Sequence, residues 1–147
     1  MSQLPVDEVL PQVLRSLDTA GRVVLRAPPG SGKTTRVALS LLDSDLTGDG
    51  VVLLLQPRRA AARSVARYLA RLRGTPIGRE VGYQVRFDSK VSSGTRLKVI
   101  TEGILIRMLQ TDPELSDVRA VLFDEFHERS LNADLGLGLI QEVQETI

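Results

Sequence analysis

Short apolar runs alternate along this chain with longer segments whose apolar residues recur at helical spacing. The short runs predict strands at residues 22–27, 51–56, 96–101 and 119–124. The longer segments predict helices at residues 7–17, 35–44, 58–74, 102–110 and 131–147. Strands that alternate with helices predict an α/β fold in which helices flank a mainly parallel sheet joined by right-handed crossovers.

The stretch between the third helix and the third strand is harder to assign. Residues 81–87, VGYQVRF, alternate as a short strand does, and residues 89–94, SKVSSG, are expected to form a loop. Gly74 is placed to end the helix that precedes this stretch.

The length and composition fit one soluble globular domain. A chain of 147 residues that is 42% hydrophobic and 25% charged can bury a sizeable core. No apolar run reaches the length of a membrane span, and the N-terminal residues lack the pattern of a secretory signal. There is no cysteine, which excludes disulfides and a cysteine nucleophile. We expect a cytoplasmic protein with no membrane partner.

The charge is unevenly distributed. Residues 56–107 carry 12 lysines and arginines against 3 acidic residues, whereas residues 108–147 carry 2 against 9. A basic block of this kind favours binding to a polyanion such as a nucleic acid. The alternative is a solvated face that balances the acidic end.

Four polar motifs follow the predicted strands. They are APPGSGKT (27–34), QPRR (56–59), ITEG (100–103) and DEFH (124–127). Ligands of open α/β sheets bind beyond the carboxyl ends of the strands. The sequence therefore predicts that all four motifs meet at one edge of the sheet.

Residues 27–34 match a phosphate loop, in which backbone N–H groups curl around an anion at the start of a helix. Gly30 and Gly32 permit the tight curl. Lys33 supplies a positive charge for the β- and γ-phosphates, and Thr34 supplies a hydroxyl for Mg²⁺. The alternatives are a glycine turn with an incidental lysine, and a Rossmann site, whose G-x-G-x-x-G pattern is absent.

The last motif supplies carboxylates for the same chemistry. Asp124 is placed to hold Mg²⁺ indirectly, through water, and Glu125 to act as the general base that deprotonates water for attack on the γ-phosphate. The alternative is a pair of polar residues that merely ends a strand. His127 is not part of a zinc site, because the chain has no cysteine and no second histidine.

Five motifs in order give this chain a family resemblance. GSGKTT, QPRRAAARSVA, VGYQVRF, ITEGILIRML and DEFHERSLNADLGLGL resemble the first motor domain of DEAH-box helicases. DEFH in place of DEAH, followed by ERSL, looks most like the bacterial HrpB-type branch. The resemblance implies a RecA-like P-loop domain that uses ATP and Mg²⁺.

The resemblance also implies that the domain binds single-stranded RNA or DNA. Arg58 and Arg59 match the family's first strand-binding motif, Thr101 matches the second, and Arg86 falls in a turn that touches the strand. For at least half of the helix arginines, a solvated face stays the preferred interpretation. These helix arginines are Arg63, Arg67, Arg71 and Arg73.

Two positions depart from the family pattern. Tyr68 stands where the family commonly has an arginine that stacks on the nucleotide base. Stacking by Tyr68, substitution by Arg67 or Arg71, and a half-buried helix aromatic all stay open. Phe126 replaces an alanine, and His127 is implied to bridge the hydrolysis site to a second motor domain.

That second domain, its arginine fingers and the family's Ser-Ala-Thr motif do not occur in the 147 residues. We therefore expect residues 1–147 to be the N-terminal RecA-like ATP-binding domain of a longer helicase, with weak or no activity alone. The alternatives are a P-loop phosphotransferase and a nucleotide-dependent nucleic-acid-binding module without turnover. Nucleotide contacts are expected from Gly30, Ser31, Gly32, Lys33, Thr34, Thr35 and Tyr68. Catalytic roles are expected for Lys33 and Glu125, and metal binding for Thr34 and Asp124.

Overall fold

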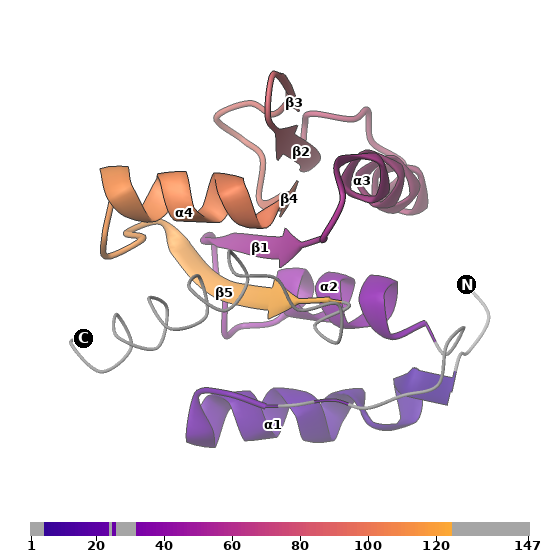
Figure 1. The fold of residues 1–147 in the computed structure, drawn as a ribbon. Helices are drawn as coiled ribbons and strands as arrows, with labels where there is room; N and C mark the ends of the chain where they lie inside the picture. The colour runs from indigo at the N-terminus through magenta and orange to yellow at the C-terminus, as the bar shows by residue number, and fades with distance from the viewer. Residues whose placement is uncertain (1–4, 24, 26–31, 125–147) are drawn as a thin grey trace.

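The computed structural model describes residues 5–23, 25 and 32–124, and the structural statements below concern these residues. The helices are the 3-10 helix η1 (Pro5–Glu8), α1 (Leu10–Ala20), α2 (Lys33–Asp43), α3 (Arg59–Arg73) and α4 (Glu102–Thr111). The strands are β1 (Val51–Leu55), β2 (Val81–Val85), β3 (Asp88–Lys90), β4 (Leu97–Ile100) and β5 (Val118–Phe123). Figure 1 shows their arrangement.

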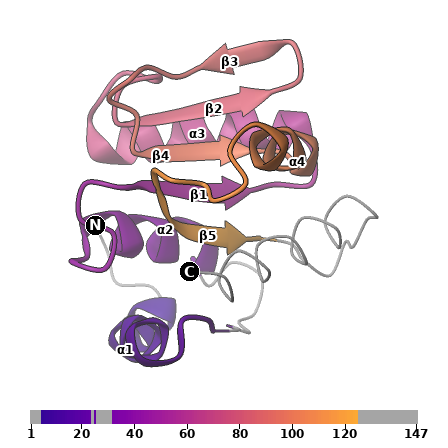
Figure 2. The ribbon, with the colours of Figure 1, turned by 90° about the vertical axis from the view of Figure 1, so that its left-hand side faces the viewer.

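The strands form one sheet in the order β3-β2-β4-β1-β5. Strands β2, β4, β1 and β5 run parallel, and β3 pairs antiparallel with β2 at the edge. Helix α4 lies on one face of this sheet, and α2 and α3 lie on the other (Figure 2). The predicted α/β class with a mainly parallel sheet flanked by helices is confirmed.

Strand β1 is buried on both faces, as expected for the centre of a parallel sheet. Val52 and Leu54 belong to the core cluster that β1 shares with α2 and α3. Leu53 and Leu55 belong to the second cluster, with residues of α4. The continuous apolar run at 51–55 is therefore explained by two cores, one on each side of the sheet.

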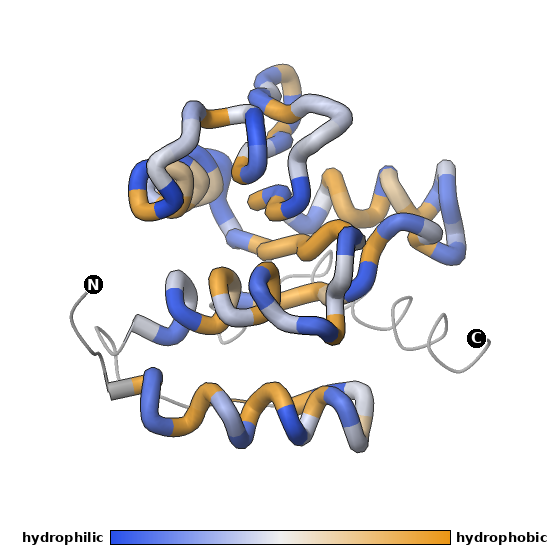
Figure 3. The backbone as a smooth tube through the Cα atoms, turned by 180° about the vertical axis from the view of Figure 1, so that it is seen from behind, coloured by the Kyte–Doolittle hydropathy of each residue, from blue (hydrophilic) through white to orange (hydrophobic). Residues whose placement is uncertain are grey.

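Helix α1 packs on the outside of α2. Its tube alternates between hydrophobic and hydrophilic residues (Figure 3), and Leu10, Leu14 and Leu17 face the larger core cluster. We predicted this helix from residue 7, but it begins at Leu10 after the separate 3-10 turn. Proline is tolerated only in the first turn of a helix, so Pro11 accounts for the later start. No helix among the described residues is long and apolar enough to cross a membrane.

The stretch that was hard to assign is a hairpin. The strand predicted at 81–87 ends at Val85, and Arg86 and Phe87 turn the chain back into β3. The predicted loop at 89–94 was wrong for Ser89 and Lys90, which pair with β2. The reversal places Asp88 where its carboxylate accepts a hydrogen bond from the Tyr83 hydroxyl at 2.9 Å.

The ends of the chain limit two further predictions. Of the strand predicted at 22–27, Arg22, Val23 and Leu25 are described, and none of the three is in a strand. The other residues of that strand, and the helix predicted at 131–147, lie outside the described residues. Gly74 ends α3 as predicted, with a left-handed φ of 69° that favours glycine.

Candidate nucleotide site and nucleic-acid interface

The carboxyl ends of three parallel strands meet at one edge of the sheet. Leu55 of β1 pairs with Ile100 of β4 and Phe123 of β5. The residues that follow these three, Gln56, Thr101 and Asp124, therefore lie next to one another at the carboxyl edge of the sheet. The backbone continues this pairing, because Gln56 N–H donates to the Ile100 carbonyl at 2.9 Å. The predicted meeting of QPRR, ITEG and DEFH at one edge is thus confirmed at their first residues.

Helix α2 brings the end of the phosphate-loop motif to this edge. It begins at Lys33, after Gly32, whose φ of 86° lies in the left-handed region that only glycine enters without strain. The Thr34 hydroxyl donates a hydrogen bond of 2.8 Å to Oδ2 of Asp124, 90 residues away in the chain. Unpaired N–H groups and the helix dipole make such a helix start suitable for an anion.

Gln56 completes this contact, although the sequence did not single it out. Its side chain is only 3% exposed, and Nε2 donates to the same Asp124 Oδ2 at 2.7 Å. Two donors therefore fix one carboxylate oxygen. The available signal was a glutamine that ends a continuous apolar strand, since a buried polar group requires a partner.

The oxygen atoms of Thr34 and Asp124 are of the kind that binds Mg²⁺. Mg²⁺ prefers oxygen ligands, and it is usually held by one or two protein groups together with substrate phosphates. The Thr34 hydroxyl, in α2, and the Asp124 carboxylate, directly after β5, offer such oxygens 2.8 Å apart. Within residues 5–23, 25 and 32–124 there is no cluster of three or more His, Cys, Asp or Glu side chains. The described site therefore offers a shared ion position and not an all-protein cage.

The other predicted contacts follow the same edge away from Asp124. Arg58 and Arg59 are exposed where β1 passes into α3, and Thr101 is half-buried at the start of α4. Arg86 is exposed in the turn after β2. Because neighbouring strands are about 4.8 Å apart, the positions from β2 to β5 extend over roughly 14 Å.

The turn after β2 also exposes an aromatic ring that sequence reasoning missed. Phe87 is 89% exposed, with a φ of 67° that is rare for a bulky residue. The Arg86 guanidinium lies 4.8 Å from the centre of its ring. No sequence signal identified Phe87, because it looked like the last apolar residue of an alternating strand.

Most of the helix arginines have partners within the fold. Arg63 lies 3.6 Å from Asp88, and Arg67 lies 5.7 Å from the centre of the Tyr83 ring. Arg73 bonds Glu80 at 2.7 Å and Asp43 at 2.9 Å. These partners raise the pKa of Arg73, first through the hydrogen bond that its guanidinium donates to the Glu80 carboxylate. Arg71 is exposed. A solvated face was expected for at least half of these arginines. Arg67 and Arg71 are exposed, whereas Arg63 and Arg73 are half-buried beside acidic side chains of the fold.

Tyr68 is 45% exposed on α3. Its neighbour Arg67, one of the two residues considered as a substitute, is directed instead to the Tyr83 ring. Lys33 and Thr35 are half-buried in the first turn of α2, where the Thr35 hydroxyl donates to the Gly32 carbonyl at 3.4 Å.

Four predicted site residues lie outside the described residues. They are Gly30, Ser31, Glu125 and His127. Phe126, which marked the family branch, is also outside them.

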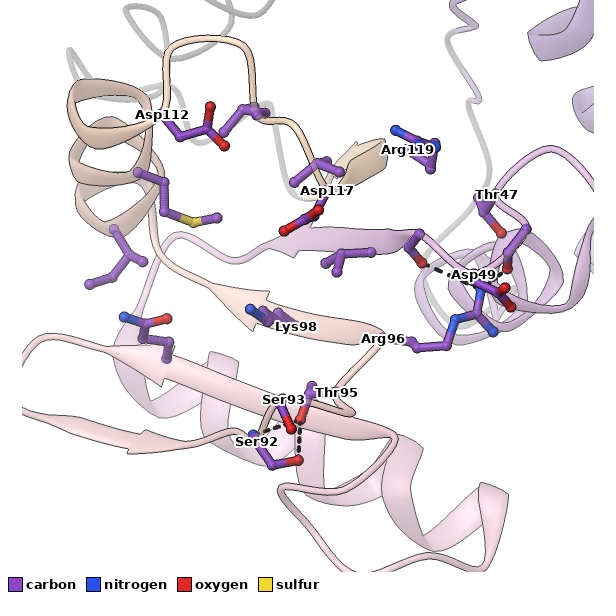
Figure 4. Close-up of a pocket in the computed structure, with 18 of the residues that line it drawn as sticks. Thr47, Asp49, Ser92, Ser93, Thr95, Arg96, Lys98, Asp112, Asp117 and Arg119 are labelled. Atoms are coloured by element: carbon purple, nitrogen blue, oxygen red, sulfur yellow. Dashed lines mark hydrogen bonds between the residues drawn. The ribbon is translucent and has the colours of Figure 1, made fainter.

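A pocket of about 1190 Å³ lies elsewhere, at the amino ends of the strands. Figure 4 shows Asp49, Lys98, Asp117 and Arg119 around it, with the Arg96 guanidinium donating to the Gly48 carbonyl. No predicted site residue lines this pocket. Ligands of parallel sheets bind at the carboxyl ends, so size does not make it the nucleotide site.

The fold and the contact between Thr34 and Asp124 define a P-loop nucleotide-binding domain of the RecA-like class. More specifically, the chain belongs to the DEAD/DEAH box helicase family, which matches residues 7–140. The DEAH-box resemblance of the sequence motifs is therefore confirmed.

Several named relatives agree with this assignment. The chain is 52% identical over 145 residues to "ATP-dependent RNA helicase HrpB" of Escherichia coli, covering 99% of this chain and 18% of that protein. It is 36% identical over 141 residues to "ATP-dependent RNA helicase HrpA" of Borreliella burgdorferi, covering 96% of this chain and 17% of that protein. It is 37% identical over 145 residues to human "Probable ATP-dependent RNA helicase DHX35", covering 97% of this chain and 21% of that protein. The higher identity to HrpB agrees with the branch expected from DEFH.

Solved structures agree as well. The crystal structure of Escherichia coli DEAH/RHA helicase HrpB matches with a TM-score of 0.92 at 52% identity, covering 97% of this chain and 18% of that one. The crystal structure of E. coli DExH-box NTPase HrpB matches with a TM-score of 0.93, covering 99% of this chain and 18% of that one. The chain spans about a fifth of the length of these relatives.

Proposed function

We propose that residues 1–147 form the first RecA-like, ATP-binding domain of an ATP-dependent RNA helicase. The observation that carries this proposal is the hydrogen bond between Thr34 and Asp124, because it joins the end of the phosphate-loop motif to the first residue of DEFH. The names of the relatives favour RNA over DNA as the nucleic acid.

In the proposed site, ATP lies at residues 30–35 with its β- and γ-phosphates near Lys33. Thr34 and Asp124 hold Mg²⁺, which neutralises charge on the phosphates. Glu125 follows Asp124 directly and orients the attacking water as a general base. Tyr68 stacks on the base, supported by its exposure on α3.

A single strand of RNA follows the carboxyl edge of the sheet away from this site. Arg58, Arg59 and Thr101 contact its sugar-phosphate backbone, supported by their positions at the ends of neighbouring strands. Arg86 and Phe87 contact the strand at the far end of the edge. An exposed aromatic beside a cation is the combination that binds unpaired bases.

The active helicase would need a second RecA-like domain, which His127 contacts and which supplies arginine fingers. The share of the relatives' length that this chain spans supports a longer protein. A cytoplasmic location is part of the proposal, supported by the lack of cysteine in the 147 residues.

Phosphate release by the full-length protein tests this function. With ATP, Mg²⁺ and single-stranded RNA, wild type should release phosphate without any acceptor, and RNA should stimulate the rate. Glu125→Gln should keep ATP binding and lose turnover, because an amide is no longer a general base. Glu114→Gln, an exposed change after α4, is the control.

Each rival has its own outcome in the same assay. Phosphate transfer that requires an acceptor would identify a phosphotransferase. ATP-dependent RNA binding without turnover would identify a binding module. Normal turnover in Glu125→Gln would refute the role of Glu125.

A further inference from the structure

Gln56 connects the nucleotide site to the proposed RNA-binding edge. It is one of three buried polar or charged residues among those described, together with Thr47 and Thr95. Thr47 and Thr95 hydrogen-bond backbone carbonyl groups, as residues that stabilise a loop commonly do. Gln56 alone of the three directs its side chain to a proposed catalytic-site residue, with Nε2 2.7 Å from Oδ2 of Asp124.

The main chain of Gln56 is held firmly at this point. Its N–H donates to the Ile100 carbonyl at 2.9 Å, so the residue extends the pairing between β1 and β4. The backbone pairing fixes the position of the Gln56 Cα, and the side chain extends from there to Asp124, directly after β5. A long, flexible glutamine held at both ends can fix the orientation of a carboxylate.

The chain after Gln56 is stiff and leads directly to the RNA-binding candidates. Pro57 has a fixed φ, and Arg58 is extended, with φ −130° and ψ 145°. Only Pro57 separates Gln56 from Arg58. A phosphate bound at Arg58 is therefore separated from Gln56 by a single residue whose φ is fixed.

We propose that Gln56 is a positioning residue that couples RNA contact at Arg58 to the Asp124 carboxylate, and through it to Mg²⁺. This inference rests on the proposed function, which assigns Mg²⁺ to Thr34 and Asp124. Thr34 is the other donor to Asp124 Oδ2, at 2.8 Å, and it belongs to the nucleotide side of the site. Gln56 is thus the donor that belongs to the RNA side.

Loss of the amide should weaken metal binding and coupling without removing the RNA contacts. Residues that orient a metal ligand typically change metal affinity or activity by about 10- to 100-fold when mutated. For Gln56→Leu we expect the Mg²⁺ concentration for half-maximal ATPase activity to rise by about 10-fold or more. RNA should stimulate the rate less than it does in wild type. RNA affinity without nucleotide should stay within about twofold of wild type.

The test uses the full-length protein and three variants. Gln56→Leu removes the amide, and Gln56→Met removes it while keeping an unbranched side chain of similar length. Gln84→Leu is the matched control, because Gln84 is a half-buried glutamine near the carboxyl end of β2, as Gln56 is at the carboxyl end of β1. Mn²⁺ binding to the ADP complex, followed by electron paramagnetic resonance, gives a readout that does not depend on turnover.

The expected result is weaker Mn²⁺ binding and a smaller RNA stimulation in both Gln56 variants, with Gln84→Leu like wild type. Unchanged Mn²⁺ binding and stimulation would overturn the inference, as would an equal change in Gln84→Leu. Loss of nucleotide-free RNA binding alone would overturn it too, because Gln56 would then serve only the RNA site. A folded Gln56→Met variant decides the question if Gln56→Leu does not fold.

Different results would refute the proposed function itself. Wild type would then show no Mg²⁺-dependent, RNA-stimulated turnover, or Asp124→Asn would keep the Mn²⁺ affinity of wild type. If wild type and Asp124→Asn behave as proposed and the Gln56 variants match wild type, only the coupling role is wrong.

Discussion

Replacing Phe87 by glycine should separate the stability of the fold from its binding of RNA. Phe87 has a φ of 67°, and the left-handed region costs an L-residue roughly 1–2 kcal/mol. Glycine removes that strain but loses about 0.5–1 kcal/mol through its freedom in the unfolded chain. The exposed contact with Arg86 contributes about 0.5–1 kcal/mol more, which is also lost. The free energy of unfolding should therefore stay within about 1 kcal/mol of wild type.

RNA binding should change far more. An aromatic ring stacked on a base contributes about 1–3 kcal/mol, which corresponds to roughly 5- to 150-fold in Kd. The ring is 89% exposed, so this stacking surface is available without rearrangement of the fold. Fluorescence anisotropy with a labelled single strand measures Kd at fixed salt, and urea unfolding measures stability.

Two further substitutions at the same position separate strain from aromaticity. Phe87→Leu keeps the strained backbone and loses the aromatic ring, so it should bind RNA as weakly as Phe87→Gly. Phe87→Tyr keeps both and should bind like wild type. Unchanged RNA affinity in Phe87→Gly would refute the contact. A loss of stability well above 1 kcal/mol would refute the reasoning about strain and show that the ring supports the fold.

Neutralising Arg58 and Arg59 together to glutamine should lower the slope of log affinity for single-stranded RNA against log salt by about 1.4, since each phosphate contact contributes about 0.7. Arg71→Gln, an exposed arginine at the other end of α3, should leave the slope unchanged, and equal slopes for both variants would argue against a specific contact. Burial and then the hydrogen bond to Asp88 raise the pKa of Tyr83 above its ordinary value of about 10. The unfolded chain therefore loses this proton first, and the stability that the neutral phenol contributes is full below about pH 10 and is lost as the pH rises through the folded pKa. Urea unfolding between pH 7 and 11 should show a steeper alkaline loss of stability in wild type than in Tyr83→Phe, and parallel profiles would contradict this assignment.

The meeting of distant motifs was accessible from the sequence. Thr34 and Asp124 are 90 residues apart, yet each adjoins a predicted strand or helix end, and parallel strands place such ends at one edge. Arg58 and Thr101 could be placed there for the same reason. In each case local periodicity gave the element, and a general rule of α/β folds gave the position.

Other contacts could not be found in this way. Arg63 and Arg67 look equivalent to Arg71 in the sequence, but only the folded hairpin places Asp88 and Tyr83 beside the first two. A basic helix face depends on what packs against it, and that depends on contacts between elements and not on spacing within the helix.

By itself the sequence determined the α/β class, the phosphate-loop motif, the family and the sheet edge at which we propose that ligands bind. These follow from hydrophobic period and from residue types at strand ends, which act over a few residues. Only the tertiary structure decided that Gln56 holds Asp124 and that Phe87 stands exposed in a left-handed turn. Hydrogen-bond partners and backbone strain arise where separate segments of the chain are forced together, and no local pattern records them.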